Sequence, residues 1–294
     1  MKLVSYRVDG AWRAGAVHDA EVIDVAAAMF LAGWIDVPSA LDVRTLLDLY
    51  GNDLASVGRS IELIEVPKRA RVGRLSDLVI GPPVPNPAKV FCIGLNYSEH
   101  VAETGRALPE HPDVFAKFAS TLIGHKTPIA GTDVTAQLDF EGELAVVIGR
   151  ATRRVGPAEA LEHVAGVSVL NDITARDLQY RGTQWLMGKA VDRSSPFGPA
   201  LITLDEIPDV QMLDITTRVN GSVMQQSNTR HMIFSVADIV SYLSQSITLS
   251  PGDVIATGTP DGIGSKRNPP VWLRSGDLVE VELEGVGTLT NLVA

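Results

Sequence analysis

The sequence predicts a mixed α+β protein in which β-structure dominates. Asn220-Gly221 lies between the alternating segments ITTRV and SVMQQ, a pattern typical of a two-residue β-hairpin. The C-terminal segment VWLRSGDLVEVELEGVGTLTNLV indicates closing strands that are separated by glycine turns. Helical patterns are few and do not alternate regularly with strands, which excludes a doubly wound parallel sheet.

Residues 1–75 are expected to form a small N-terminal α+β domain. The segment KLVSYRVDGAWRAGAVHDAEVIDV alternates apolar and polar residues around Asp9-Gly10, which indicates a hairpin, and residues 25–34 and 41–64 have helical spacing. The segment GPPVPNPAK follows and contains four prolines in nine residues. Because proline fits neither a helix interior nor a central strand, we interpret this segment as a connector.

The remaining residues, 80–294, are expected to form the β-rich body. Its strands are short and are punctuated by turn residues. Four short helices are predicted in it, with Ser235 as the N-cap of the last one. They span residues 97–104, 157–163, 174–179 and 235–244.

Composition narrows the class of partner and the compartment. The net charge of −10 argues against nucleic acid and anionic membranes, which require a basic surface. Cys92 is the single cysteine, so an intrachain disulfide is impossible and a reducing compartment is favoured. The N-terminus has no unbroken apolar segment typical of a secretory signal, and no apolar run reaches the roughly 20 residues of a membrane helix. We expect a cytoplasmic protein.

Several common functional motifs are missing. The segment GTPDGIGSK lacks the GxxxxGK[ST] spacing of a phosphate loop, and no GxGxxG motif opens a helix after a strand. No GxSxG motif is present, and the six histidines lie far apart in the sequence. These observations argue against a nucleotide-binding fold, a serine hydrolase and a zinc site.

Three carboxylates indicate a site for a divalent cation. In DFEGELAVVIG, Asp139, Glu141 and Glu143 alternate and should project from one face of a strand that ends in a core-like apolar run. A second core-like strand, VAGVSVLND, ends in Asp172. The oxygens of Glu141, Glu143 and Asp172 would suit Mg²⁺, Mn²⁺ or Ca²⁺. The alternative is a solvent-facing strand edge with scattered acids.

Cationic and amide groups follow these strands. Arg176 and Gln179 are three residues apart in NDITARDLQ and, on a helix, would share a face that can bind a carboxylate. Lys189 supplies another cation in MGKAVDRSSPFGP. The alternatives are an ordinary solvated helix and a surface lysine.

A candidate general base lies earlier in the chain. His100 and Glu103 are three residues apart in CIGLNYSEHVAETG, so on a helix the carboxylate can orient the imidazole. In DVIATGTPDGIG, Thr257 and Thr259 lie among glycines, where hydroxyl and backbone N–H groups can meet a substrate oxygen. The alternatives are an exposed His–Glu pair and a plain turn.

In this order and spacing, the motifs resemble the fumarylacetoacetate hydrolase family. The segments that carry the resemblance are GLNYSEHVAETG, DFEGELAVVIG, LNDITARDLQ, GKAVDRSSPFGP and PGDVIATGTPDGIG. They extend over residues 89–264, and the segment before residue 75 resembles that of the bacterial members. The resemblance implies a mixed β-roll around a metal ion, commonly in a homodimer.

The resemblance implies a role for each acid. Glu141, Glu143 and Asp172 match the metal ligands of the family, with Mg²⁺ or Mn²⁺ as the ion, and Asp139 takes a supporting position. In the eukaryotic enzymes a further metal-binding Asp precedes the histidine by seven residues, and this chain has Ile93 there. A three-carboxylate site and the smaller bacterial subgroup are therefore implied.

The resemblance also implies the organic side of the site. Arg176 and Gln179 match residues that hold the substrate, and Lys189 matches a cation that also stabilises developing negative charge. The pair His100 and Glu103 matches a dyad that activates water. The last matching residue is in the glycine-rich substrate loop: Thr259.

The implied reaction is hydrolysis of a C–C bond in a 2,4-dioxo acid, an acylpyruvate such as fumarylpyruvate or acetylpyruvate, as in aromatic catabolism. The products are pyruvate and a carboxylic acid. Oxaloacetate decarboxylation or isomerisation of a 2-oxo or enol acid is an alternative, which would survive loss of the dyad. Another is a non-catalytic protein that binds small acids. Phe115 and Phe118 are candidates for an apolar pocket wall or for core packing.

Overall fold

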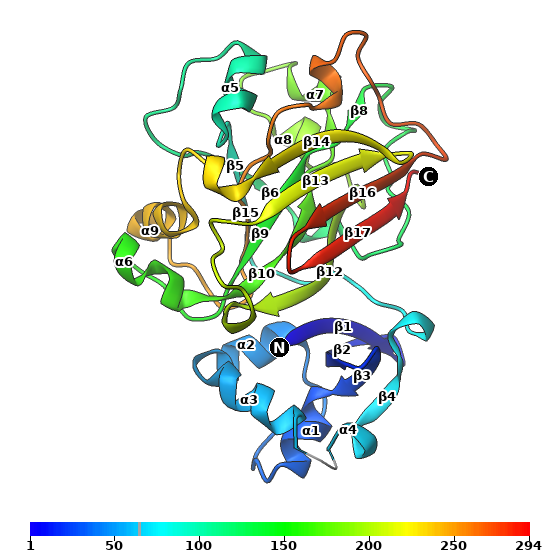
Figure 1. Ribbon diagram of the computed structural model, residues 1–294, viewed down its shortest axis with the longest axis vertical. Helices are drawn as coiled ribbons and strands as arrows, with labels where there is room; N and C mark the ends of the chain where they lie inside the picture. Colours follow the sequence, from blue (N-terminus) through cyan, green and yellow to red (C-terminus); the bar gives the residue numbers. More distant parts are fainter. Residues whose placement is uncertain (64–65) are drawn as a thin grey trace.

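The structure, a computed structural model, describes residues 1–63 and 66–294 and is mainly β, as predicted (Figure 1). Within the described residues, eleven strands form one mixed sheet in the order β4-β3-β2-β1-β12-β10-β9-β15-β5-β6, with β7 paired to β12. Their bounds are β1 Lys2–Val8, β2 Ala11–His18, β3 Glu21–Asp24, β4 Arg71–Arg74, β5 Val90–Gly94, β6 Asp113–Lys117, β7 Leu122–Ile123, β9 Gly142–Ile148, β10 Val164–Asn171, β12 Ser195–Thr203 and β15 Val254–Ala256.

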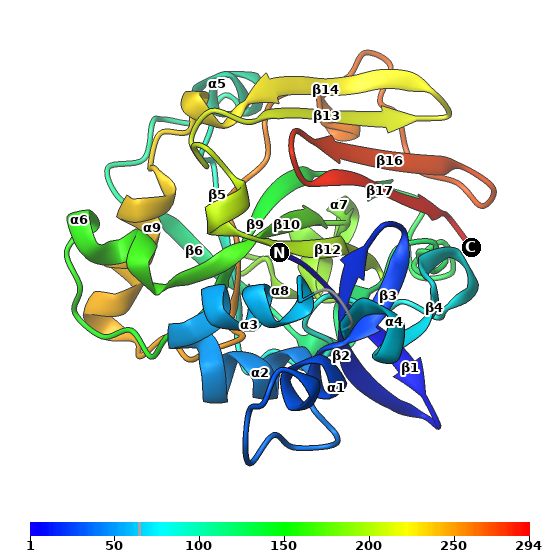
Figure 2. The same ribbon diagram turned by 60° about the horizontal axis from the view of Figure 1, so that its bottom comes forward.

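A second sheet covers one face of the central strands (Figure 2). Its order is β14-β13-β16-β17, with bounds β13 Asp214–Val219, β14 Ser222–Asn228, β16 Leu278–Leu283 and β17 Gly287–Leu292. The predicted hairpin is confirmed, because Val219 pairs with Ser222 and both turn residues, Asn220 and Gly221, have positive φ. Side chains of the two sheets, such as Leu144 and Val281, share one apolar core.

The N-terminal hairpin is also confirmed, with Val8 paired to Ala11. The predicted helix 41–64 instead divides at a 3₁₀ turn, Gly51–Asp53, and its last residue lies outside the described residues. A methyl group at Gly51 would lie 1.9 Å from the Gly149 carbonyl oxygen, so the chain approaches its neighbour closely at this break. The helices here are α1 Val25–Leu31, α2 Val43–Tyr50, α3 Leu54–Ile61 and α4 Val66–Arg69.

The N-terminal segment joins the sheet of the body. Strand β1 pairs with β12 through Leu3 and Leu201, and both side chains lie in one core cluster with Leu46 of α2. In Figure 1, α2 lies beside β1 at this junction, whereas α1 and α4 lie on the side away from the body. The division into domains 1–75 and 80–294 stays a prediction.

The helices of the body are short. Their bounds are α5 Ser98–Thr104, α6 Pro157–Ala160, α7 Arg176–Gln179, α8 Leu186–Lys189 and α9 Val236–Ser246. Two of them are shorter than predicted: α6 continues as a 3₁₀ turn, and Thr174–Ala175 forms the strand β11, which pairs with β8 (Leu138–Asp139). The N-cap Ser235 is confirmed and forms a capping box with Asp238. None of the helices described is long and apolar enough to cross a membrane.

Candidate active site

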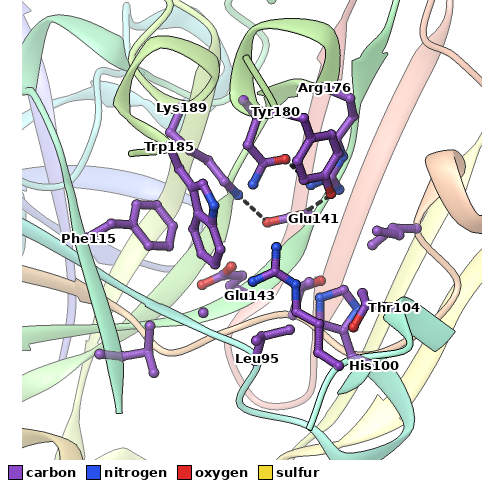
Figure 3. Close-up of a pocket in the computed structure, with 16 residues that line it drawn as sticks. Leu95, His100, Thr104, Phe115, Glu141, Glu143, Arg176, Tyr180, Trp185 and Lys189 are labelled. Carbon is purple, nitrogen blue, oxygen red and sulfur yellow. Dashed lines mark hydrogen bonds and ion pairs between the residues drawn. The ribbon is translucent and has the colours of Figure 1, made fainter. Parts of the chain in front are cut away.

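A small cavity lies where several chain segments of the body meet (Figure 3). The start of β9, the loop after β15, and α5, α7 and α8 all contribute to its wall. Its volume is about 40 Å³. The predicted site residues that line it are His100, Glu141, Glu143, Arg176, Gln179, Lys189 and Thr259.

Three buried carboxylates gather at this cavity. One oxygen each from Glu141, Glu143 and Asp172 lies within 4.8 Å of the other two. The antiparallel register of β9 and β10 brings them together, because Leu170 pairs with Glu143 and the Asp172 N–H donates to the Glu141 carbonyl at 2.8 Å. The sequence prediction that these three acids meet is therefore confirmed.

Asp139 lies outside the cluster of the three acids, although its carboxylate contacts the same Arg176 guanidinium as that of Glu141. Asp139 belongs to β8, and the chain leaves strand geometry at Phe140 and Glu141 before β9 begins. Its carboxylate instead accepts from Arg176 Nε at 2.8 Å and from the backbone N–H groups of Gly264 and Ser265. Asp139 thus fixes Arg176 and the loop beside the cavity.

Cations compensate two of the three clustered acids. Lys189 Nζ lies 2.6 Å from Glu141 and 2.7 Å from Asp172, and Lys117 Nζ lies 2.6 Å from Asp172. Arg176 Nη2 forms an ion pair with Glu141 at 2.6 Å. Burial alone would raise the pKa of Glu141, but Lys189 and Arg176 outweigh it and lower that pKa to about 2.

Glu143 differs from its two neighbours. Its carboxylate accepts a hydrogen bond from the Gly258 N–H at 2.8 Å and has no ion pair within the described residues. Burial raises the pKa of Glu143 well above its usual range, and the charges of Asp172 and Glu141 raise it further. A cluster of hard oxygen donors with an uncompensated carboxylate fits a divalent cation, so the residues present match the metal implied by the sequence.

The predicted general-base pair is formed. Nδ1 of His100 lies 2.7 Å from Oε1 of Glu103, and the Gly262 N–H donates to the other oxygen of Glu103 at 2.9 Å. The ring of His100 lines the cavity on the side opposite α7 and α8 (Figure 3). Since Nδ1 is engaged by Glu103, Nε2 is the ring nitrogen available to a ligand.

Three of the four predicted substrate-binding residues line the cavity, and Thr257 does not. Arg176 Nη1 donates to Gln179 Oε1 at 3.0 Å, so the two side chains form one polar face. The Thr259 hydroxyl donates to the Gly142 carbonyl and accepts from Gln225. Thr257 is fully buried, donates to the Leu144 carbonyl and does not line the cavity. Of the two threonines, only Thr259 can meet a ligand there.

Sequence reasoning missed Lys117 and, of the two neighbouring phenylalanines, misjudged Phe118. Phe115 and Lys117 belong to β6, where residues two apart share a face, and this alternation could have identified Lys117 beside the cavity. Phe115 lines the cavity, whereas Phe118 follows the strand and is 53% exposed. The interpretation of Phe118 as wall or core residue is therefore wrong.

Three further lining residues were also missed. They come from the segments that follow α5 and α7, where the sequence shows only isolated polar and aromatic residues. Tertiary packing decides which side chains of these segments turn toward the carboxylates. The three residues are Arg106, Tyr180 and Trp185.

The residues of this site lie within the part of the chain that matches known proteins. Residues 89–294 match the family model described as fumarylacetoacetate (FAA) hydrolase C-terminal. The chain is 44% identical over 223 residues to the oxaloacetate tautomerase YisK of Bacillus subtilis, which covers 74% of each chain. These matches concern the part of the chain that carries the carboxylates and the His–Glu pair.

Solved structures extend the similarity to the whole chain. The fumarylacetoacetate hydrolase of Exiguobacterium antarcticum has a TM-score of 0.83 at 35% identity, covering 100% of this chain and 99% of the other. The maleylpyruvate hydrolase of Sphingobium, solved with manganese(II) and pyruvate, has a TM-score of 0.78 at 28% identity with the same coverage. The chain belongs to the fumarylacetoacetate hydrolase family.

Proposed function

We propose that this enzyme interconverts the enol and keto forms of a short 2-oxo dicarboxylic acid, with oxaloacetate as the reference substrate. The observation that carries the proposal is that His100, held by Glu103, lines the same cavity as Glu141 and Glu143 of the acidic cluster. A 2-oxo acid held at the carboxylates would present its C3 atom to the imidazole. The name of the Bacillus subtilis relative, an oxaloacetate tautomerase, supports the same chemistry.

Glu141, Glu143 and Asp172 would hold Mg²⁺ or Mn²⁺. The chemistry that such an ion supplies is Lewis-acid polarisation of a chelated 2-oxo carboxylate. Arg176 and Gln179 would bind the substrate carboxylate from the wall opposite His100. Both side chains line the cavity, and a hydrogen bond joins them to each other.

The proton transfer would use the imidazole of His100. In the direction from enol to ketone, the C2 hydroxyl loses its proton to solvent on binding. The C2=C3 electron pair then takes a proton from His100 Nε2, and C2=O forms. Glu103 would hold the ring by its Nδ1 contact and stabilise the imidazolium. Lys189 and Thr259 would stabilise the negative charge on the substrate oxygens.

This geometry changes one expectation from the sequence. Activity on oxaloacetate was expected to survive loss of the dyad, because neither decarboxylation nor ketonisation needs attack by water. With His100 facing the cavity, however, ketonisation has a proton donor in place. We now expect tautomerisation to depend on His100.

Hydrolysis of an acylpyruvate is the second candidate. The same His100–Glu103 pair can deprotonate a water for attack on the distal carbonyl of the substrate. The Sphingobium relative, a maleylpyruvate hydrolase solved with pyruvate, supports this reaction.

The first test assays protein that has been stripped with EDTA and reloaded with Mg²⁺ or Mn²⁺. The decay of enol-oxaloacetate absorbance reports tautomerisation, and pyruvate release from acetylpyruvate or fumarylpyruvate reports hydrolysis. We expect His100→Ala to lower the turnover of tautomerisation by about 10²–10⁴-fold, the usual contribution of general acid–base catalysis, while metal binding is retained. His18→Ala, which removes a half-buried histidine at the end of β2 that does not line the cavity, is the matched control and should keep full activity.

Each result selects one function. Metal-dependent tautomerisation lost in His100→Ala supports the proposal, and cleavage of acylpyruvates without tautomerisation would replace it with the hydrolase. Pyruvate release from oxaloacetate alone would indicate a decarboxylase. Metal binding without any turnover would indicate a protein that only binds small acids. The homodimer and the cytoplasmic location stay predictions from the sequence.

A further inference from the structure

Arg106 differs from the other cations that line the cavity. Arg176 and Lys189 form ion pairs with Asp139, Glu141 and Asp172. The Arg106 guanidinium, by contrast, has no hydrogen bond or ion pair within residues 1–63 and 66–294. Its charge and its donor groups are therefore available to a ligand.

An aromatic surface holds this guanidinium at the cavity. The Arg106 Cζ atom lies 5.3 Å from the centroid of a Trp185 ring, within the range of a cation–π contact. Trp185 packs edge-on against Phe115, with ring centroids 5.5 Å apart, and both rings line the cavity (Figure 3). The contact orders the arginine without using any of its N–H donors.

The position of Trp185 depends in turn on Gly94. A methyl group at Gly94 would lie 2.7 Å from Cζ3 of Trp185, so the indole can rest on the end of β5 only because residue 94 has no side chain. This packing fixes the indole between the strand and Arg106. The three residues together form one ordered wall of the cavity.

We propose that Arg106 binds the distal carboxylate of the substrate and thereby selects 2-oxo dicarboxylic acids over monocarboxylic ones. The inference rests on the proposed function and names the residue that recognises the second carboxylate of its substrate. The 2-oxo carboxylate end would be held at the acidic cluster with Arg176 and Gln179, as proposed above. The second carboxylate of a four-carbon diacid lies at the other end of a short chain. There an unpaired guanidinium can donate two N–H groups to its oxygens.

The charge of the cavity supports this assignment. Three clustered acids face three cations that are already engaged with them or with Asp139, so a second anionic group on the ligand has no other unpaired partner among the described lining residues. Without Arg106, a second carboxylate on the ligand would lie in the same cavity as the clustered acids with no counter-charge of its own, which is unfavourable. A monocarboxylate makes no such demand.

The test compares Arg106→Gln and Arg106→Lys with wild type on two substrates, oxaloacetate and pyruvate. Pyruvate carries the same 2-oxo carboxylate without the distal group, and its enolisation is followed by NMR as loss of methyl protons in D₂O. We expect Arg106→Gln to lower kcat/KM for oxaloacetate by about 10- to 100-fold, mainly through KM, as for loss of a charge-assisted hydrogen bond. Pyruvate exchange should change by less than about twofold, and Arg106→Lys should be intermediate.

Two controls separate this inference from other effects. Arg59→Gln removes an arginine of α3, far from the cavity in the fold, and should leave both substrates unaffected. Oxalate imitates only the 2-oxo carboxylate end of the substrate, because its two carboxylates are joined directly and no further group follows. Its calorimetric binding to the Mn²⁺-loaded variants should match wild type and reports an intact primary site.

The possible outcomes are distinct. If wild type turns over oxaloacetate but Arg106→Gln affects both substrates equally, or neither, the inference is wrong and the proposed function stands. If wild type turns over neither substrate, the proposed function fails. Calorimetry with oxaloacetate and pyruvate then decides the inference alone, because a selective loss of oxaloacetate binding in Arg106→Gln would still support it and an equal affinity would overturn it.

Discussion

At the scale of single residues, Glu143 has a different electrostatic environment from the two acids beside it. Its raised pKa means that the folded, metal-free protein binds a proton at Glu143 more tightly than the unfolded chain does. The resulting stabilisation is present below the ordinary glutamate pKa and is lost as pH rises through the raised pKa. At neutral pH this residue therefore destabilises the metal-free protein.

We predict that Glu143→Gln stabilises the metal-free protein at pH 7 by about 1 kcal/mol, or about 2–4 °C in Tm. The amide oxygen keeps the hydrogen bond from Gly258 and removes the buried charge. The variant should lose most of the stabilisation that added Mn²⁺ gives wild type, because a cation binds through a carboxylate that the variant lacks. Thermal unfolding with EDTA and with Mn²⁺ measures both effects.

Glu159→Gln, an exposed glutamate in α6, is the control and should change neither Tm value measurably. The opposite sign applies to Glu141, whose pKa is lowered to about 2. Its contribution to stability is present above the ordinary value of 4.5 and is lost as pH falls toward 2. A destabilised Glu143→Gln protein in EDTA would contradict this account of the cluster.

At the scale of elements, the site depends on the packing of two very short helices. The helices α7 and α8 carry Arg176, Gln179 and Lys189, and they contact each other at Gly188. A methyl group at Gly188 would lie 2.5 Å from the Gln179 backbone nitrogen and 2.6 Å from the Ala175 carbonyl oxygen. The helices can approach closely only because this position has no side chain.

Gly188→Ala is therefore expected to separate α7 from α8 and to destabilise the protein by about 1–3 kcal/mol, as overpacking does. Turnover should fall as well, since Lys189 and Gln179 would move apart. Gly182→Ala, in the loop between α7 and α8, is a matched control, because a methyl group there meets no atom within 4 Å. Denaturant unfolding and the tautomerase assay measure the two effects, and equal behaviour of the two variants would disprove the role of the close approach.

The helices and strands differ in how well they could be predicted from the sequence. Both two-residue hairpins and the N-cap at Ser235 follow from local chemistry, so their positions were predictable from a few adjacent residues. The break of the predicted helix at Gly51 was not, because its cause is a contact with Gly149, almost a hundred residues away. Local patterns do not record such contacts.

The same distinction applies to the site. Glu141, Glu143 and Asp172 could be predicted to meet because each adjoins an apolar, core-like strand. Arg106 and Trp185 lie in segments without periodicity, and their contact depends on how those segments pack above β5. No local signal marks such a pair.

At the scale of the whole molecule, the N-terminal segment and the body share one sheet and one core. The pairing of β1 with β12 continues the sheet from β4 to β6, and the side chains of Leu3, Leu46, Leu170 and Phe197 belong to a single apolar cluster. Separating the two parts would expose this cluster to water. We therefore expect residues 1–75 and the body to unfold together.

Leu3→Ala tests this coupling. Leu3 is fully buried at the junction, so its truncation should destabilise the protein by about 2–5 kcal/mol, and calorimetry should still show a single transition at lower temperature. Leu49→Ala removes a leucine of α2 that is 53% exposed and should cost less than about 0.5 kcal/mol. Two separate transitions, only one of them shifted by Leu3→Ala, would instead mean that the N-terminal segment folds as an independent domain. The cavity would then be carried by the body alone, since all of its lining residues belong to the body.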